Sequence, residues 1–265
     1  MNKARKAGAE IKAVEALAQG NSLVHRLSPL SKLAMALAYI IITVSFGKYD
    51  YSALIVMLLF PVIGYQLALI PIGTCFYKLR IVLPLVCAVG VFNPVFDREI
   101  MLRIGNVAVS GGVISMITLM MKGVFSLMMS FLLVSTTPVD ELCRALRKIH
   151  FPKLLVSLLL LTFRYVSAML DEVAVMTDAY HLRAPGQKGI HFSAWGTFLG
   201  QLILRSSDRA NEIYSAMLLR GFTGDFDYSP PKKYSRLSPL IALILISLFI
   251  AARLFNVISL FGRLK

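Results

Sequence analysis

Five long apolar blocks dominate this chain and limit the folds that it can adopt. They run over approximately Leu33–Phe46, Tyr51–Ile70, Ile81–Phe96, Val113–Ser135 and Leu237–Ala252. A helix that crosses a bilayer needs about 20 apolar residues, and the second and fourth blocks reach this length. Charged residues make up only 16% of the chain, whereas soluble domains carry about 25%. The blocks therefore predict an all-α, polytopic membrane protein with about five transmembrane helices.

Short helices and helix breaks are expected within this pattern. The first and third blocks are too short for a membrane span, so they must borrow flanking residues or cross a thin region. Pro61 with Gly64 in the second block, and Pro84 with Pro94 in the third, predict kinks or early helix ends. The loop Asp97–Gly112 carries mixed charges and predicts a short hairpin.

The distribution of basic residues sets the orientation. Basic residues precede the first block and follow the second, at Lys3, Arg5, Lys6, Lys12, Arg26, Lys32, Lys78 and Arg80. The loop after the first block offers only Lys48 beside Asp50. The positive-inside rule therefore predicts a cytoplasmic N-terminus. We attribute the net charge of +14 to this bias and to anionic lipid, and not to nucleic acid, because no nucleic-acid-binding module is recognisable.

The chain is predicted to fall into four segments. Residues 1–32 form a cytoplasmic or interfacial N-terminal helix, 33–136 hold transmembrane helices 1–4, 137–236 form a cytoplasmic coupling-helix module, and 237–265 hold a C-terminal transmembrane helix. The third segment is rich in charged residues, yet it is too apolar for an ordinary soluble domain. Three helices are expected there, opened by Thr137 or Pro138, by Pro152 and by Ser193.

The last two of these helices are expected to be long and amphipathic. They would end at Arg183 and Arg220 and reach roughly 45 Å each. The final helix carries an apolar stripe formed by Trp195, Phe198, Leu199, Leu202, Ile203, Ile213 and Met217. Its other face is mostly charged, through Arg205, Asp208, Arg209 and Glu212. Such helices need apolar cover along one side, which the underside of a membrane domain supplies, and we regard Arg205 and Arg209 as structural or coupling candidates.

Each long helix ends in a bulky residue, an arginine and a small residue. The two ends read Leu182-Arg183-Ala184 and Leu219-Arg220-Gly221. One interpretation is local, because a cation near the last carbonyls of a helix is mildly stabilising. The other is that each arginine contacts a carboxylate or carbonyls of a partner protein through charge-assisted hydrogen bonds. Two long helices that end alike favour the second interpretation, and Gly221 is expected to stop its helix in the C′ position.

Two further stretches carry a family resemblance. They are HRLSPLSKLAMAL (His25–Leu37) and QLILRSSDRANEIYSAMLLRGFTG (Gln201–Gly224). Together with the arginine-ended helices, they resemble the T component of energy-coupling-factor ABC importers, of the CbiQ type. Ser28 stands where the family usually has aspartate. The family's two docking motifs are usually Ala-Arg-Gly or Ala-Arg-Ser, so Leu182, Leu219 and Ala184 depart mildly from them.

The resemblance implies a coupling function. The T component transmits ATPase motion to a separate substrate-binding membrane subunit, through coupling helices whose arginine tips dock on two ATPase subunits. The implied partners are an ABC ATPase dimer of the CbiO type, a CbiM-type substrate subunit, a small CbiN-type accessory subunit and membrane lipid. The implied substrate is cobalt or nickel. ATP and Mg²⁺ would bind the ATPase, so this chain is expected to bind no cofactor. The implied location is a bacterial or archaeal cell (inner) membrane.

Two charged residues within apolar stretches need partners. Lys122 lies near the middle of the fourth block, where an unpaired cation is costly. We expect Lys122 to hold its helix against backbone carbonyls of the bundle. Arg164 would join the coupling helices to each other or to the membrane layer, with Asp171 and Glu172 as candidate partners.

No catalytic or metal-binding constellation is apparent in the sequence. The motifs GxxxxGK[ST], HExxH and GxSxG are absent, and no histidine has an acidic or cysteine partner at ligand spacing. We therefore assign no catalytic and no metal residues, and we expect a non-enzymatic subunit. The alternatives are a T component for another micronutrient such as a vitamin, an autonomous membrane transporter, and an intramembrane protease or lipid transferase. An autonomous transporter would predict an internal repeat, which we do not find.

Overall fold

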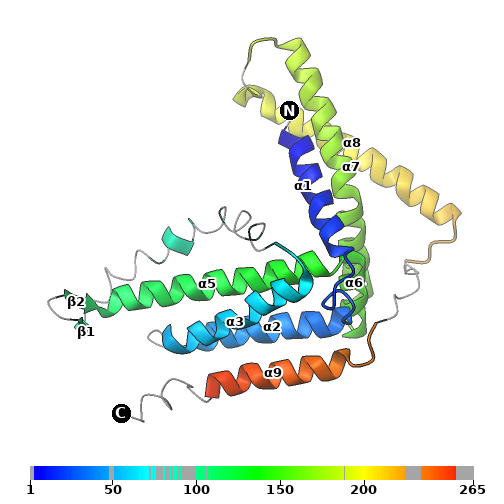
Figure 1. Cartoon of the computed structure of the whole chain (residues 1–265). Helices are drawn as coiled ribbons and strands as arrows, with labels where there is room; N and C mark the ends of the chain where they lie inside the picture. Colours follow the sequence, from blue (N-terminus) through cyan, green and yellow to red (C-terminus); the bar gives the residue numbers. More distant parts are fainter. Residues whose placement is uncertain are drawn as a thin grey trace. The chain divides into compact units, whose positions relative to one another are not determined.

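The structure, a computed structural model, divides into two compact units of mostly helical chain (Figure 1). It describes residues 3–47, 51–71, 73, 75, 80, 84, 86–88, 90, 100–104, 107–187, 189–224 and 234–254. The bundle unit comprises Leu17–Pro138 and Lys232–Lys265, and the rod unit comprises Met1–Ala16 and Val139–Pro231. Most of the third apolar block, with the break predicted at Pro94, lies outside the described residues.

Four helices of the bundle unit match predicted apolar blocks. They are α2 (Pro29–Ser45), α3 (Tyr51–Ala68), α5 (Gly111–Thr136) and α9 (Ser238–Leu254). Both α5 and α9 pack against α2 and α3. The first block does borrow flanking residues, because α2 begins at Pro29 with Ser28 as its N-cap.

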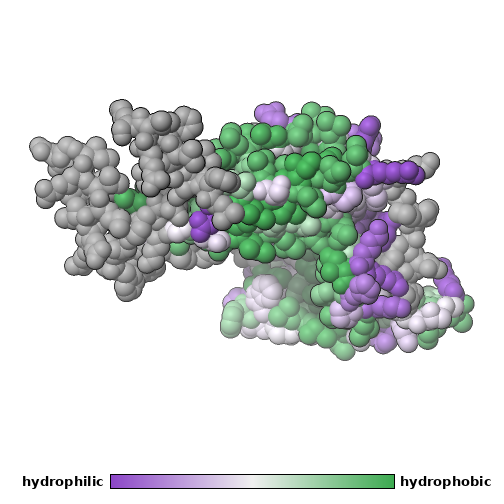
Figure 2. Space-filling model, turned by 90° about the horizontal axis from the view of Figure 1, so that it is seen from below, coloured by the Kyte–Doolittle hydropathy of each residue, from purple (hydrophilic) through white to green (hydrophobic). Residues whose placement is uncertain are grey.

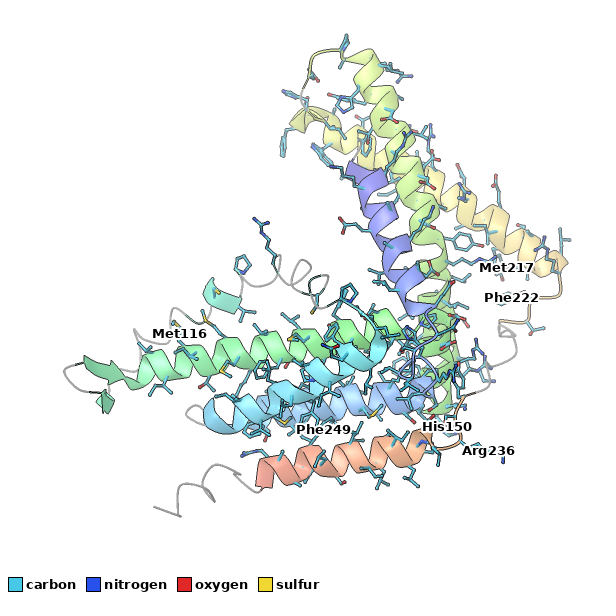
Figure 3. All side chains as sticks on the ribbon, viewed as in Figure 1. Met116, His150, Met217, Phe222, Arg236 and Phe249 are labelled. Carbon is cyan, nitrogen blue, oxygen red and sulfur yellow. The ribbon has the colours of Figure 1, made fainter. Side chains whose placement is uncertain are left out.

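An aromatic cluster holds α2, α3 and α9 together. Tyr39 and Phe249 meet edge to face with ring centroids 5.4 Å apart, and Phe60 meets Phe249 at 4.6 Å. Phe249 of α9 points toward these neighbouring helices (Figure 3). The Tyr39 hydroxyl donates to the backbone oxygen of Met57 at 2.8 Å, so the polar end of this buried ring is satisfied.

The α3 and α5 helices approach each other closely at Gly64. A Cβ atom on Gly64 would lie 2.5 Å from Leu132 Cδ2, so a larger residue would require the Leu132 side chain to move. The Tyr65 hydroxyl links the same two helices by donating to the backbone oxygen of Met128 at 2.9 Å. Pro61 lies inside α3, which continues beyond it, so the helix does not end early at this proline.

A short antiparallel hairpin precedes α5. β1 (Ile100–Ile104) pairs with β2 (Val107–Ser110), with Ile104 opposite Val107. The hairpin predicted within residues 97–112 is therefore confirmed. The other described elements are helices, which confirms the predicted all-α class.

The rod unit is built on two long helices. It contains most of α1 (Lys3–Ala18), then α6 (Val139–Lys148), α7 (Lys153–Arg183), the 3₁₀ helix η1 (Phe192–Ala194) and α8 (Trp195–Leu219). α6 packs against α7, and α8 crosses α7 (Figure 1). Arg5 of α1 donates to Asp178 of α7 at 3.0 Å. α8 begins at Trp195 and not at Ser193, because Ser193 lies in η1, where its N–H is bound by the His191 ring.

The short helix α6 shows the charge order that a helix dipole favours. Asp140 and Glu141 lie in its first turn, and Arg147 and Lys148 in its last, as predicted. Burial, together with the charge of Asp140, raises the pKa of the Cys143 thiol to about 11. The Cys143 side chain is therefore protonated and unreactive near neutral pH.

The rod unit buries little of its own apolar surface. No residue of α8 is buried, and in α7 the buried residues are Val156, Ser157 and Ala174. Large apolar side chains are exposed on both helices, including Leu154, Leu158, Leu199, Ile203 and Leu204. Apolar surface of this extent needs cover from lipid or from another protein.

Length and apolar composition identify the helices that can cross a membrane. Among the described helices, α5 and α7 are long and apolar enough. Shorter apolar helices run over 29–45, 54–68 and 238–253. In the bundle unit, α9 exposes Leu240, Leu243 and Ile244, and hydrophobic residues gather over the face seen from the α9 side (Figure 2).

Candidate functional site

The C-terminal end of α8 has the geometry that its sequence predicts. Arg220 is the C-cap, and Gly221 follows with φ +80°, a left-handed conformation that glycine adopts without strain. The Gly221 N–H donates to the Leu218 oxygen at 2.9 Å, and the Phe222 N–H donates to the Met217 oxygen at 3.0 Å. These two bonds form a Schellman motif, with Met217 and Phe222 on either side of the turn (Figure 3).

The C-terminal end of α7 is fixed by a tyrosine in place of a glycine turn. Arg183 is the last helical residue, and the Ala184 N–H donates to the Tyr180 oxygen at 3.0 Å. The Tyr180 hydroxyl donates to Gln187 Oε1 at 3.0 Å and accepts from the His191 N–H at 3.2 Å. One side chain therefore holds the loop that returns the chain to α8.

Both helix ends present an exposed leucine and an exposed arginine. Leu182 is 84% exposed and Leu219 is 90% exposed. Arg183 and Arg220 are exposed as well, and neither side chain forms a hydrogen bond or ion pair with a described residue. Within the described chain, neither arginine side chain therefore makes the contact with the last carbonyls of its own helix that the local interpretation would suggest. The arrangement offers two cationic tips, each beside an apolar side chain.

An ion pair joins the two long helices where they cross. Arg205 of α8 donates to Glu172 of α7. Glu172, a candidate partner for Arg164, is thus engaged by Arg205. The Arg164 guanidinium instead lies 6.0 Å from the centre of the Tyr165 ring, and Arg209 is exposed on α8.

The HRLSPLSKL stretch forms a junction at one end of the bundle unit. Ser28 caps α2 by accepting from the Ser31 N–H, and its own N–H donates to the Ser238 hydroxyl at 3.1 Å. The backbone oxygen of Arg26 accepts from the Ser235 N–H at 3.2 Å. These bonds tie the start of α2 to the start of α9. Serine in place of the usual aspartate keeps the capping role, since both residues are favoured N-caps.

Lys32 is buried at this junction, although its place in the sequence predicted only a basic residue before the first span. It is 4% exposed, and its Nζ donates to the Thr136 oxygen at 2.7 Å and to the His25 oxygen at 3.3 Å. Thr136 ends α5, and the last carbonyls of a helix have no partner within it. Lys32 of α2 therefore caps the C-terminal end of α5. A lysine one turn into an apolar helix was the sequence signal for this contact.

Lys122 of α5 makes the reciprocal contact at the C-terminal end of α2. Its Nζ donates to backbone oxygens of Val44, at 3.2 Å, and of Phe46, as expected for a cation held against carbonyls. Arg253 of α9 donates to the intervening Ser45 oxygen at 3.0 Å and lies 4.9 Å from the centre of the Phe46 ring. Three consecutive carbonyls at the end of α2 thus have cationic donors. α2 and α5 each carry a lysine that caps the other helix.

The described residues contain no group of three or more His, Cys, Asp or Glu side chains that could hold a metal ion. The absence of a metal site and of a catalytic group from the whole chain stays a prediction. In the described chain, the two exposed tips at the ends of the crossed helices form the candidate binding site for a partner protein.

Comparisons with known proteins agree on a transporter family. A family model described as "Cobalt transport protein", CbiQ, matches residues 20–234. An "Energy-coupling factor transporter transmembrane protein EcfT" of Lactococcus lactis subsp. cremoris is 24% identical over 245 residues, covering 86% of this chain and 91% of that protein. A "Nickel permease LarQ" of Lactiplantibacillus plantarum is 29% identical over 119 residues, 43% of this chain, and this chain spans only 44% of that relative. A "Cobalt transport protein CbiQ" of Rhodobacter capsulatus is 28% identical over 119 residues, 44% of this chain and 47% of that relative.

The family match includes most of the candidate site, whereas Ser235, Ser238 and Arg253 lie beyond its end. Residues 20–234 contain the junction stretch, Lys122, the crossed helices α7 and α8, and both Leu-Arg ends. The match with EcfT extends over most of both chains. The chain belongs to the CbiQ family, and it is a transmembrane T component of an energy-coupling-factor transporter.

Proposed function

We propose that this chain couples an ABC ATPase dimer to a separate substrate-binding membrane subunit through α7 and α8. The observation that carries the proposal is the pair of exposed tips, Leu182-Arg183 and Leu219-Arg220, at the ends of two crossed helices. Neither arginine binds a described residue of its own chain, so both guanidinium groups are available to a partner.

The chemistry of the tips suits a contact that transmits motion between two proteins. An arginine guanidinium makes paired, charge-assisted hydrogen bonds with a carboxylate, and the neighbouring leucine adds an apolar anchor. α7 has 31 residues and α8 has 25, so the two rods are about 46 Å and 38 Å long. When ATP binding closes the ATPase pair, the tips would move with it, and the rods would carry this displacement to the substrate subunit. ATP and Mg²⁺ belong to the ATPase, and this chain contributes no catalytic residue.

The proposed topology places the rod unit on the cytoplasmic side of a multi-pass membrane protein with a cytoplasmic N-terminus. α7 is apolar enough to cross a membrane, but Asp171, Glu172, Asp178 and Arg183 are concentrated in its second half. Charges at that density are costly within a bilayer and favour a helix at the interface. The exposed leucines in its first half would then contact the membrane layer or the substrate subunit.

The proposed substrate is a transition-metal ion, cobalt or nickel. The family description and the names of LarQ and CbiQ support this choice. The expected partners are a CbiO-type ATPase dimer, a CbiM-type substrate subunit and a CbiN-type accessory subunit. The alternative is a T component that serves another micronutrient, such as a vitamin. The alignment with EcfT covers 86% of the chain and is compatible with either substrate class, because the name EcfT specifies no substrate.

Charge reversal at the tips tests the coupling proposal. Arg183→Glu and Arg220→Glu should each reduce the amount of ATPase that co-purifies with the chain, and the double variant should abolish both co-purification and ATP-dependent uptake. Lys12→Glu is the matched control, because Lys12 is exposed on α1 and belongs to neither helix end. Normal assembly and uptake in the double variant would refute the docking role.

Uptake measurements separate the two substrate classes. Cells that express the complete transporter are supplied with radioactive cobalt, nickel or a panel of vitamins. The metal proposal predicts uptake of cobalt or nickel that is lost in the double tip variant. If only a vitamin is taken up, and this uptake also depends on the tips, the coupling role is supported and the substrate is a vitamin instead of a metal ion.

A further inference from the structure

An apolar cavity of about 650 Å³ lies in the bundle unit and is lined by residues of α2, α3, α5 and α9. Its apolar lining includes Ala36, Ile63, Leu67, Leu132, Leu245 and Leu248. A cavity of this size can bury most of a small ligand. The role proposed above for the rod unit does not use it.

One end of the cavity is cationic. Arg26 and Lys32 line this end together with Thr136 and Ser235, and the lining contains no carboxylate. The Lys32 ammonium is engaged by backbone oxygens, whereas the Arg26 side chain is exposed and forms no hydrogen bond or ion pair with a described residue. The cavity thus combines an apolar interior with an available cation at its rim.

A second arginine stands next to this rim. Arg236 is exposed and follows Ser235, whose N–H donates to the Arg26 oxygen at 3.2 Å, so the two arginine-bearing segments are adjacent. Arg236 lies where the chain enters α9 (Figure 3). The N-termini of α2 and α9 are both at this junction and add positive potential, whereas the C-terminal carbonyl of α5 at Thr136 is capped by Lys32.

The length of the cavity along α9 fits within one leaflet of a bilayer. Its α9 wall runs from Ile241 to Leu248, about 10 Å along the helix. Half of a hydrocarbon core is about 15 Å thick. The cationic rim lies at the helix ends that the positive-inside rule assigns to the cytoplasm, where the leaflet is rich in anionic lipid.

We propose that this cavity binds one acyl chain of an anionic phospholipid, whose phosphate contacts Arg26 and Arg236. A partner helix would also cover the apolar lining, but apolar cover alone supplies no anion to the exposed Arg26 and Arg236 side chains. A phospholipid satisfies both parts, because it carries a hydrocarbon chain and a phosphate in one molecule. The proposal does not depend on which substrate the transporter carries.

Photo-crosslinking in nanodiscs tests this site on the full chain. The probes are phosphatidylglycerol and phosphatidylcholine that carry a diazirine in one acyl chain, each at the same mole fraction. Adducts should concentrate on the lining residues Ile63, Leu67, Ile241, Leu245 and Leu248, with phosphatidylglycerol favoured there by roughly fivefold or more. At Leu243, which is 71% exposed on α9 outside the cavity lining, both lipids should react alike.

Two kinds of variant sharpen the result. Arg26→Gln with Arg236→Gln should remove the preference for phosphatidylglycerol, while Arg26→Lys with Arg236→Lys should keep it. Ile63→Trp places a bulkier side chain in the cavity lining, where Ile63 is 52% exposed, and should lower adduct formation inside but not at Leu243. Lys12→Gln removes an exposed charge elsewhere and should change nothing.

Two outcomes would overturn the proposal. Equal labelling by both lipids at the cavity and at Leu243 would show ordinary annular lipid only. Labelling of the cavity in the isolated chain, but not in the transporter assembled with its partner subunits, would assign the cavity to a partner helix.

Discussion

The bundle unit and the rod unit both place cations at helix C-termini, but they use them differently. In the bundle unit, Lys32, Lys122 and Arg253 donate to carbonyls at the ends of neighbouring helices. In the rod unit, Arg183 and Arg220 stand at the ends of their own helices, exposed and without a described partner. The preference of helix C-termini for cations thus stabilises the bundle unit internally, whereas in the rod unit the cations are available to bind a partner.

The largest expected effect is the loss of a cap inside the bundle unit. Lys32→Met removes the donor of the Thr136 carbonyl at a buried site, and an unsatisfied buried acceptor costs about 1–3 kcal/mol. We expect a clearly lower melting temperature of the purified chain in detergent. Lys12→Met, at an exposed site of α1, is the control and should leave the melting temperature unchanged. Equal melting of the two variants would show that the Lys32 contact adds nothing to stability.

The helices of the bundle unit were predictable because their apolar blocks are long and their breaks are marked. The helix of block four, the hairpin before it and the glycine stop of α8 all occur where the sequence placed them. Lys122 was also informative, because a lone lysine in an apolar helix has few partners other than carbonyls.

Other features of the site were not readable from the sequence because they join distant segments. Lys32 contacts Thr136, which is far away along the chain, so its position one turn into an apolar helix does not identify the carbonyl that it caps. The pairing of Glu172 with Arg205 depends on where α7 and α8 cross, which helix periodicity does not determine. The fixation of the α7 end by Tyr180 likewise depends on the path of its loop.

A smaller effect is expected from the turn that ends α8. Gly221→Ala forces a residue with a Cβ into φ +80°, at a cost of about 1–2 kcal/mol, although the space around it is open. Hydrogen exchange of a peptide that covers residues 213–224 should become faster. Gly200→Ala, in the interior of the same helix and also in open space, should instead slow exchange slightly. Faster exchange in both variants would mean that the positive φ of Gly221 is not the cause.

A gain in stability is expected where a similar turn lacks glycine. α6 ends in the same pattern, with the Phe151 N–H donating to the Leu146 oxygen at 3.3 Å and His150 at φ +62° (His150 is labelled in Figure 3). His150→Gly should stabilise α6 by about 0.5–1 kcal/mol. This value is the free energy saved by removing a side chain from the left-handed conformation, minus the entropy cost of ordering a glycine. The measurement is hydrogen exchange in α6. Exchange that is unchanged or faster would contradict the expected gain.

The smallest effect is expected from the ion pair that joins α7 and α8. The Arg205 side chain is 53% exposed, so solvent screening should limit the coupling energy with Glu172 to about 0.2–1 kcal/mol. A double-mutant cycle with Arg205→Gln and Glu172→Gln, read by hydrogen exchange of α8, measures this energy. If the pair also sets how the rods cross, the single variants should lower transport more than stability. Swapping the charges, Arg205→Glu with Glu172→Arg, should then restore transport, and failure of this rescue would limit the pair to a surface contact.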